Sequence, residues 1–419
     1  MKPVRSALAL AQAQLAGRLG EERLRRLQEA KLRRMVHHAF ATVPFYRRLW
    51  QASGVDPAGV RTLDDLQHLP VVTKAQLQAA GEEARLSTAY DRATLISKRT
   101  SGSTGRPMTL FRDAAFEERQ KLRFLRALLA GGLRPWHRLL LVAGGLDESR
   151  SGLPGWRYVS SEAPPELVQG TFEAHRPHLL YGFLTPIRQM AQLARERGQP
   201  RPLKALFTTA ETLDPATRAL LEDTFRTELF DIYGCTETGP LAWECRAHAG
   251  YHVAADGVVL ECLGGGTGEA GRVLVTSLDL RAMPLIRYEV GDLAVPASAG
   301  PCPCGSRLPR LMRIEGRIAD CVRLADGRLL SPYHLTLALE EVAGIDRYQI
   351  VQQGIDRFLV RAQGPGRGEQ GVVAAAIAAL QRHLGAGARV QLRWEEDLEP
   401  PPGRKFRPVE CRLGAEAIA

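Results

Sequence analysis

The sequence lacks the long apolar run that a membrane-spanning helix requires. Nowhere in its 419 residues do about 18 or more apolar residues follow one another. Residues 6–16 imitate a signal peptide, but glutamines interrupt the apolar run and a charged helical pattern follows over residues 21–34. We therefore expect an amphipathic helix at this end, no transmembrane segment, and a cytoplasmic protein.

Several sequence patterns that mark other functions are also absent. No block of Lys and Arg is interleaved with aromatic residues, so we expect no nucleic-acid partner despite the formal charge of +10. That charge either attracts anionic ligands such as nucleotides or solvates the surface, and we favour the second interpretation for most of the arginines. There is no G-x-S-x-G nucleophile elbow, which disfavours a serine hydrolase.

Cysteine is scarce, and its seven positions do not suit a secreted disulfide framework. Cys302 and Cys304 are two residues apart and Cys245 lies upstream, a grouping more typical of metal chemistry. With His248 they make two close pairs that could hold Zn²⁺ tetrahedrally, and His252 competes with His248 for the fourth position. The alternative is that Cys302-Pro-Cys-Gly305 is a tight turn with free thiols.

The apolar patterns predict an α/β protein with a β-rich part and a small α+β unit at its C-terminal end. Short apolar runs over residues 138–143, 179–181 and 203–209 alternate with helical patterns, which is typical of a mainly parallel sheet. Residues 257–262 and 272–277 predict a hairpin. The G-x-G-x-x-G at 266–271 lies between these strands, so we interpret it as a turn and not as a dinucleotide site.

Five motifs carry possible chemistry, and each is a weak signal by itself. The loop Thr100-Ser-Gly-Ser-Thr-Gly-Arg-Pro107 could wrap phosphates, although it lacks the spacing of a Walker loop. Tyr233-Gly-Cys-Thr-Glu237 offers a carboxylate after an apolar strand. Arg287-Tyr-Glu-Val-Gly-Asp292, Gly316-Arg317 and Lys405 follow in that order.

Together, the order and spacing of these motifs resemble the adenylate-forming superfamily of acyl- and aryl-CoA ligases. Within it, the chain is most similar to the phenylacetate–CoA ligase branch and its short capsule-associated relatives. The supporting segments are Pro44-Phe-Tyr46, Leu69-Pro-Val-Val-Thr-Lys74, Thr209-Ala-Glu-Thr-Leu213 and Cys302-Pro-Cys-Gly-Ser-Arg-Leu-Pro-Arg310. The resemblance covers roughly residues 40–410. It implies a large N-terminal adenylation domain, residues 1–315, and a small mobile C-terminal domain, residues 316–419.

The resemblance implies an activity and a role for each motif. The enzyme would use ATP and Mg²⁺ to convert a carboxylic acid, aromatic or medium acyl, into acyl-AMP, and would then transfer the acyl group to coenzyme A. The β- and γ-phosphates of ATP would be embraced by Thr100, Ser101, Gly102, Ser103, Thr104 and Gly105. Ala210, Glu211 and Tyr233 would frame the adenine and the acyl pocket.

The remaining roles concern the reacting phosphate. Thr236 would touch the α-phosphate, and Glu237 would carry Mg²⁺. Asp292 would hold the ribose hydroxyls, and Arg317 would contact ribose or phosphate at the domain junction. Lys405 would bridge the acid and the α-phosphate, and the small domain would then swing and replace it with a surface that admits the thiol.

The chain departs from the pattern of the resembled family in three places. One is the segment Arg323-Leu-Ala-Asp-Gly-Arg-Leu-Leu330, which lacks the family's Gly-Val-Asn-Val-Phe-Pro run. Ala319 stands where the hinge motif Gly-Arg-x-Asp-Asp has its first Asp, and Arg404 separates Gly403 from Lys405. The acceptor therefore stays open between coenzyme A and an amine, a carrier protein or a polysaccharide, with nucleotidyl transfer to a hydroxyl as a further variant. A non-catalytic scaffold is disfavoured because the candidate site residues are retained. The resemblance also suggests a homodimer and, in some relatives, a structural zinc.

Overall fold

We describe the fold from a computed structural model that covers residues 17–99, 108–144, 155–198, 200–266, 268–398, 400 and 406–413. These residues form two compact units. The first contains Met1–Leu133, Phe230–Val290 and Ala294–Arg313, and the second contains Arg134–Leu229, Gly291–Leu293 and Ile314–Ala419. Of the predicted site, the phosphate loop (residues 100–105) and Lys405 lie outside the described residues.

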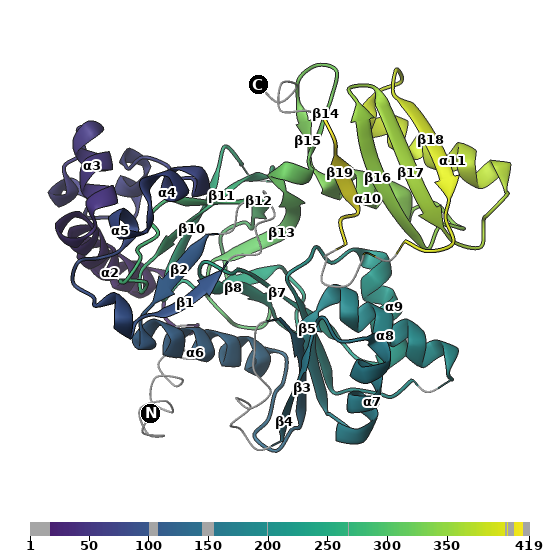
Figure 1. The fold of residues 1–419 in the computed structure, drawn as a ribbon, viewed down its shortest axis with the longest axis horizontal. Helices are drawn as coiled ribbons and strands as arrows, with labels where there is room; N and C mark the ends of the chain where they lie inside the picture. Colours follow the sequence, from purple (N-terminus) through teal and green to yellow (C-terminus); the bar gives the residue numbers. More distant parts are fainter. Residues whose placement is uncertain are drawn as a thin grey trace. The chain divides into compact units, whose positions relative to one another are not determined.

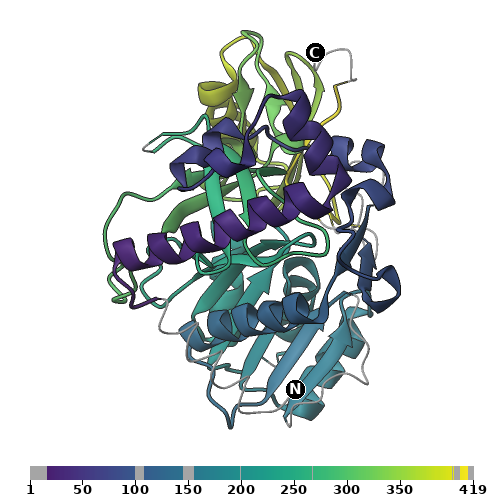
Figure 2. The same cartoon turned by 90° about the vertical axis from the view of Figure 1, so that its left-hand side faces the viewer.

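Helices cover the strands of the first unit. The buried residues of α2 (Glu21–Thr42) recur every three or four positions, as an amphipathic helix requires: Leu24, Gln28, Leu32, Met35, Val36 and Ala39. Figure 2 shows α2, in purple, lying across strands of this unit, where Lys31 Nζ donates to Asp256 O at 2.6 Å. The other helices are α3 (Pro44–Ala52), α4 (Lys74–Ala80), α5 (Glu82–Arg85) and α6 (Ala114–Ala130), with short 3₁₀ turns at Pro57–Gly59, Asp64–His68 and Arg92–Thr94.

Strands that belong mostly to the first unit are hydrogen-bonded in the order β10, β11, β12, β13, β9, β8, β7. Within them, Gly291–Leu293 of β12, the end of β13 from Ile314 and Leu229 of β7 are assigned to the second unit. The bounds of these strands are β7 (Leu229–Cys235), β8 (Gly239–Glu244), β9 (Tyr251–Val253), β10 (Val258–Leu263), β11 (Gly271–Ser277), β12 (Tyr288–Pro296) and β13 (Arg310–Arg317). A separate antiparallel pair is formed by β1 (Ile96–Arg99) and β2 (Thr109–Arg112). Antiparallel pairing of β10 with β11 confirms the predicted hairpin around the G-x-G-x-x-G segment.

The second unit contains the predicted parallel sheet. Its strands lie in the order β6, β5, β3, β4, and every neighbouring pair among them is parallel. The bounds are β3 (Leu139–Ala143), β4 (Trp156–Ser160), β5 (Leu179–Phe183) and β6 (Ala205–Thr209), with α7 (Pro165–His175), α8 (Leu184–Glu196) and α9 (Pro215–Phe225) packed on one face (Figure 1). β5 and β6 are parallel, so their carboxyl ends lie at the same edge of the sheet. The residues that follow these two strands therefore lie at that edge.

The C-terminal part of the second unit is a four-stranded sheet in the order β18, β17, β16, β19, with α10 and α11 packed against it. The bounds are β16 (Arg347–Gly354), β17 (Arg357–Gln363), β18 (Arg389–Trp394), β19 (Val409–Cys411), α10 (Pro332–Glu340) and α11 (Gln370–Leu384). The short pair β14 (Val322–Arg323) and β15 (Leu329–Leu330) precedes it, after a 3₁₀ turn at Ile318–Asp320. The predicted α+β pattern is thus present, whereas the domain boundary at residue 316 stays a prediction.

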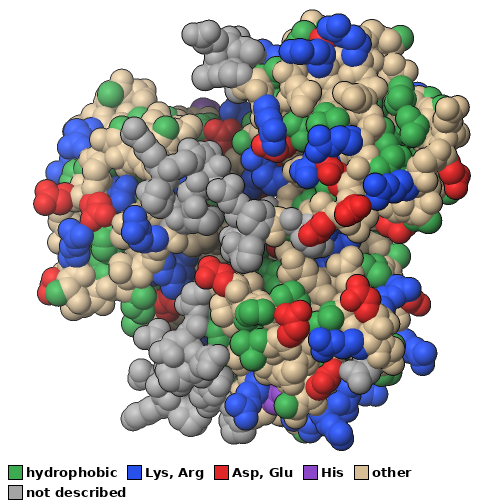
Figure 3. Space-filling view, turned by 45° about the vertical axis from the view of Figure 1, so that its right-hand side comes forward, with side chains coloured by type: hydrophobic (Ala, Val, Ile, Leu, Met, Phe, Trp, Pro, Cys, Tyr) green, Lys and Arg blue, Asp and Glu red, His purple; other side chains and the backbone are tan. Residues whose placement is uncertain are grey.

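The surface carries mixed charge. On the face drawn in Figure 3, Lys and Arg side chains are interspersed with acidic and uncharged ones and do not form one continuous basic area. Such scattering is how solvating surface charge is distributed. Within the described part of the chain, none of the helices has the length and apolar character needed to cross a membrane.

Candidate active site

Glu237 is the centre of a buried polar cluster in the first unit. It lies in the turn between β7 and β8 and is only 8% exposed. The phenol of Tyr288, the first residue of β12, donates to Glu237 Oε1 at 3.2 Å. Lys74 Nζ, at the start of α4, lies 4.0 Å from the same oxygen. The phenol and the ammonium therefore approach the same carboxylate oxygen.

The turn that carries Glu237 is held from both sides by the segment that follows the predicted phosphate loop. Arg112, in β2, donates to the carbonyl of Thr236 and also to Glu117 Oε1 at 2.9 Å. Gln120, in α6, donates to the carbonyl of Thr238. Since β2 begins two residues after Pro107, the structure connects the Glu237 turn directly to the element that follows this loop.

A glycine is required at the end of the same turn. Gly239 has φ +73°, and a Cβ there would lie 1.9 Å from Gln120 Oε1. Any other residue would therefore push away the amide that supports Thr238. Tyr233, which the resemblance places near the adenine, is buried in β7 and pairs with Ala242 of β8.

In the second unit, Ala210 and Glu211 follow β6. Ala210 adopts φ +75°, a left-handed conformation that a residue with a Cβ seldom takes and that is often found at functional sites. The carboxylate of Glu211 accepts hydrogen bonds from Thr185 N at 3.2 Å, from the Thr185 hydroxyl, and from Phe406 N at 3.3 Å. Glu211 therefore ties the start of α8 to the residue that directly follows Lys405.

Asp292 is predicted to hold the ribose hydroxyls and Arg317 to contact ribose or phosphate, and the second unit brings the two together. Arg317 Nε lies 3.7 Å from Asp292 Oδ1, and Asp292 is buried whereas Arg317 is exposed. Gly291 and Gly316 precede them with φ values of +89° and +101°. These left-handed glycines turn the backbone next to each charged side chain, which explains the Gly-Asp and Gly-Arg pairs in the sequence.

A second cluster in the first unit contains four of the five predicted metal ligands. The ligand atoms of Cys245, His252, Cys302 and Cys304 all lie within 4.8 Å of one another. His248 is not among them, because its ring stacks on Phe230 at 5.2 Å between centroids. The sequence offered either His248 or His252 as the fourth metal ligand, and the structure brings His252 and not His248 to the three cysteines.

The spacing within this cluster fits a tetrahedral zinc. Two sulfurs bound at about 2.3 Å would be about 3.8 Å apart, and a sulfur and an imidazole nitrogen about 3.6 Å apart. Cys245 Sγ and Cys302 Sγ are 3.7 Å apart, and Cys304 Sγ is 3.4 Å from His252 Nε2. Burial lowers the pKa of His252 to about 4, so its ring is in the neutral form that binds metals.

Several residues of the site were not given a role by the sequence. Lys74 and Tyr288 lie inside recognised motifs, yet nothing in the motifs shows that both reach Glu237. Arg112 and Gln120 carry no local signal, because their partners are main-chain carbonyls more than 100 positions away. Only the pairing of distant segments reveals these contacts.

Comparison with known proteins places this geometry in context. The chain is 30% identical to phenylacetate–coenzyme A ligase of Thermus thermophilus in an alignment of 360 positions, which covers 80% of this chain and 79% of that protein. It is 22% identical to protein CapK of Staphylococcus aureus over 354 residues, covering 80% and 77% of the two chains. No protein-family model matches the sequence.

The fold matches a solved structure closely. A 2-hydroxyisobutyryl-CoA ligase in the postadenylation state, in complex with R3-HIB-AMP, superposes with a TM-score of 0.81 at 20% identity. The match covers 95% of this chain and 92% of that one. At this identity the likeness concerns the fold alone, and it confirms the predicted α/β architecture.

Proposed function

Because the chain belongs to the phenylacetate–coenzyme A ligase family of adenylate-forming enzymes, we propose that it activates a carboxylic acid with ATP and passes the acyl group to coenzyme A. The observation that carries the proposal is the 30% identity to the Thermus thermophilus ligase over 80% of the chain. A carboxylate oxygen attacks the α-phosphorus and pyrophosphate leaves, which gives acyl-AMP. The thiol then attacks the acyl carbon and AMP leaves, which gives the thioester.

The first step forces two anions together, so the site must supply positive charge. Glu237 is our candidate ligand for Mg²⁺, since it is a buried carboxylate oriented by Tyr288. When bound, the ion supplies charge that offsets the repulsion between carboxylate and phosphate. Lys74 adds a second positive charge at the same carboxylate. Arg112 and Gln120 fix the turn, so that the cluster is preorganised.

The remaining motif residues are our candidates for binding the nucleotide and the acid. We propose that Asp292 accepts hydrogen bonds from the ribose hydroxyls and that Arg317 orients Asp292 while contacting ribose or phosphate. Ala210, Glu211 and Tyr233 border the adenine and the acyl pocket, Thr236 contacts the α-phosphate, and the 100–105 loop holds the outer phosphates. Lys405 meets the charge that develops between acid and α-phosphate.

A pyrophosphate-release assay over a panel of aromatic and aliphatic acids, with and without coenzyme A, tests the proposal. We expect acid-dependent pyrophosphate release, a thioester in the presence of coenzyme A, and a rate about 100- to 1,000-fold lower for Glu237→Gln. Glu21→Gln, an exposed carboxylate in α2, is the control and should leave the rate unchanged. No pyrophosphate with any acid would refute the proposal. Acyl-AMP without thioester would instead favour an amine, carrier-protein or polysaccharide acceptor.

We also propose that Cys245, His252, Cys302 and Cys304 hold a structural Zn²⁺. Four protein ligands close the coordination shell, which is typical of structural and not catalytic zinc. Burial raises the pKa of Cys245 to about 12, so without a metal this thiol stays protonated. Zinc binding would join β8 and β9 to the loop before β13.

Metal analysis of the purified protein tests the zinc proposal. We expect about one zinc per chain in the wild type and loss of the metal together with a lower melting temperature in His252→Ala. His248→Ala is a matched control, because His248 is near the cluster in sequence but its ring stacks on Phe230. Zinc-free wild type purified without chelator, or equal metal loss in both variants, would contradict the assignment.

A further inference from the structure

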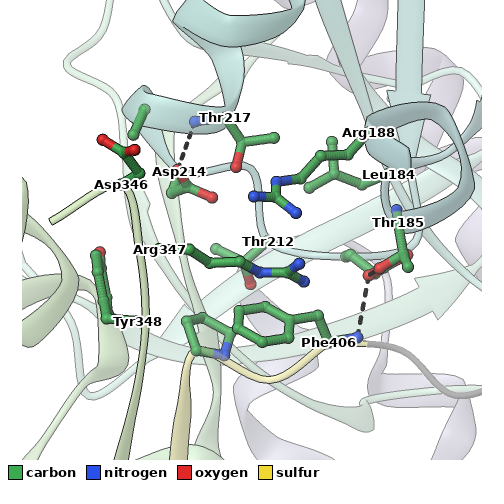
Figure 4. Close-up of a pocket in the computed structure, with 13 residues that line it drawn as sticks. Leu184, Thr185, Arg188, Thr212, Asp214, Thr217, Asp346, Arg347, Tyr348 and Phe406 are labelled. Atoms are coloured by element: carbon green, nitrogen blue, oxygen red, sulfur yellow. Dashed lines mark hydrogen bonds between the residues drawn. The ribbon is translucent and has the colours of Figure 1, made fainter. Parts of the chain in front are cut away.

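A cleft in the second unit lies beside the segment that follows Lys405. It is partly open to solvent. One side is formed by the start of α8 and by the residues around the start of α9, and the other by the start of β16 and by residues 406 and 408. Figure 4 shows the guanidinium groups of Arg188 and Arg347 pointing into this cleft, with the Phe406 ring beside Arg347.

Phe406 is held by its backbone and by its ring at the same time. Its N–H donates to Glu211 Oε2 at 3.3 Å, and the Arg347 guanidinium carbon lies 4.1 Å from the centre of its ring. A guanidinium over an aromatic face within about 6 Å is a favourable cation–π contact, and it is strongest where water is excluded. Arg347 is only 6% exposed, so this contact is largely removed from water.

Arg347 keeps its positive charge in this position. Burial, and after it the neighbouring charge of Arg188, lowers the pKa of Arg347 to about 9. Asp397, Asp214 and Glu211 oppose that shift. The guanidinium is therefore protonated at neutral pH, and the cation–π contact with Phe406 is available under the conditions in which the enzyme would work.

The residues after Phe406 are fixed as well. Arg407 forms an ion pair with Asp320, and its carbonyl accepts from Gln349 Nε2 at 3.2 Å. The carbonyl of Pro408 accepts from Ile350 N at 2.8 Å, and β19 then pairs in parallel with β16. The chain immediately downstream of Lys405 is thus attached to β16, to the 3₁₀ turn at Ile318–Asp320 and, through Phe406, to the residue after Ala210.

We infer that Arg347 is a positioning residue for adenylation: by stacking on Phe406 while Glu211 binds the Phe406 amide, it fixes the chain next to Lys405 in the arrangement that the first half-reaction needs. The inference rests on the proposed function. Lys405 acts in acyl-AMP formation and is replaced before thiol attack in the resembled mechanism. Losing the stacking contact should therefore slow the first half-reaction and spare the second.

The two half-reactions can be measured separately with Arg347→Gln, Phe406→Leu and the double variant. We expect single-turnover acyl-AMP formation to fall about tenfold or more in each single variant. The rate at which preformed acyl-AMP and coenzyme A give thioester should change less than about twofold. Because the two residues act through one contact, the double variant should be no slower than the worse single variant.

Controls separate this inference from the proposed function and from simple loss of folding. Arg393→Gln alters an exposed arginine of β18 and should change neither half-reaction. Phe406→Tyr keeps the aromatic face and should restore the first half-reaction. Should Arg347→Gln fail to fold, Phe406→Leu and Phe406→Tyr carry the test. Equal losses in both half-reactions, or unchanged acyl-AMP formation, overturn the inference, whereas an inactive wild type refutes the proposed function itself.

Discussion

Two side chains from distant parts of the chain converge on one carboxylate, that of Glu237, in the first unit. Tyr288 donates a hydrogen bond to Glu237 without adding charge, whereas Lys74 adds a charge 4.0 Å away. The phenol can keep the carboxylate oriented in every state of the reaction. The positive charge of the Lys74 ammonium has its largest effect when the negatively charged ATP phosphates bind nearby. We therefore assign Lys74 to the binding of these phosphates.

Replacement of Lys74 tests this assignment at the residue scale. We expect Lys74→Met to slow acyl-AMP formation about tenfold to 100-fold and to raise the KM for ATP, because one positive charge near the phosphates is lost. Lys74→Arg should recover part of the rate. Steady-state kinetics with varied ATP measures the effect, and Lys121→Met, an exposed lysine of α6, is the control. A variant with wild-type KM and kcat would show that Lys74 is only a structural partner of Glu237.

At the scale of elements, the start of α4 determines where Lys74 lies. Thr73 caps the helix, with Gln76 N donating to Thr73 Oγ1 at 3.3 Å and Thr73 N donating to Gln76 Oε1 at 2.8 Å. One residue earlier, Val72 forms a parallel bridge with Tyr288. The bridge and the capping box together place Lys74 and Tyr288 against the same carboxylate.

Removal of this cap should therefore affect function as well as stability. We expect Thr73→Ala to lower the free energy of unfolding by about 1 kcal/mol and to slow acyl-AMP formation several-fold, because the first turn of α4 frays. Asp56→Ala removes the cap of the 3₁₀ turn at Pro57–Gly59 and should affect stability alone. Denaturant unfolding measures the loss of stability in each variant, and single-turnover kinetics measures the loss of activity. Together they distinguish Thr73→Ala from Asp56→Ala. Equal activity in both variants would mean that the cap does not position Lys74.

Much of the fold could be predicted because the signals are local. The Thr73 cap and the helix over Gln370–Leu384 follow from residues that are close together in the sequence. The structure also contains elements that the sequence did not predict, among them β4, α7 and β19. β19 has only three residues and exists because it pairs with β16, about 60 positions away, which no local pattern can show.

The candidate site likewise has residues that the sequence indicated and contacts that it did not reveal. The order of the motifs indicated Glu237, Asp292 and Arg317, but their partners come from strand pairing between segments far apart in the chain. The choice of metal ligand is a clear case, because both His248 and His252 have suitable spacing from Cys245. The pairing of β9 with β13 sets His252 opposite Arg310, near the Cys302 and Cys304 loop. Spacing alone contains no information on that register.

At the scale of the whole molecule, one carboxyl links stability to pH. Burial, reinforced by the charge of Asp214, raises the pKa of Glu340 to about 7, although Tyr348 donates a hydrogen bond to it. The ordinary pKa of a Glu carboxyl is 4.5, so the folded state holds this proton more tightly than the unfolded state. Glu340 therefore costs no stability below about pH 4.5, and the folded protein loses stability as the pH rises toward 7.

Neutralising Glu340 should remove this pH dependence. We expect Glu340→Gln to raise the free energy of unfolding by about 1 kcal/mol at pH 8 and to have almost no effect at pH 4.5, with the magnitude reduced because the group is only partly buried. Glu341→Gln alters the neighbouring carboxyl, which is exposed and lies 3.5 Å from Arg382. This control should change the free energy of unfolding by the same amount at both pH values. Urea unfolding of the three proteins at both pH values measures the difference. If Glu340→Gln and wild type differ equally at pH 4.5 and pH 8, the carboxyl does not bind its proton preferentially in the folded state, and the stability of the molecule at alkaline pH must be limited by other groups.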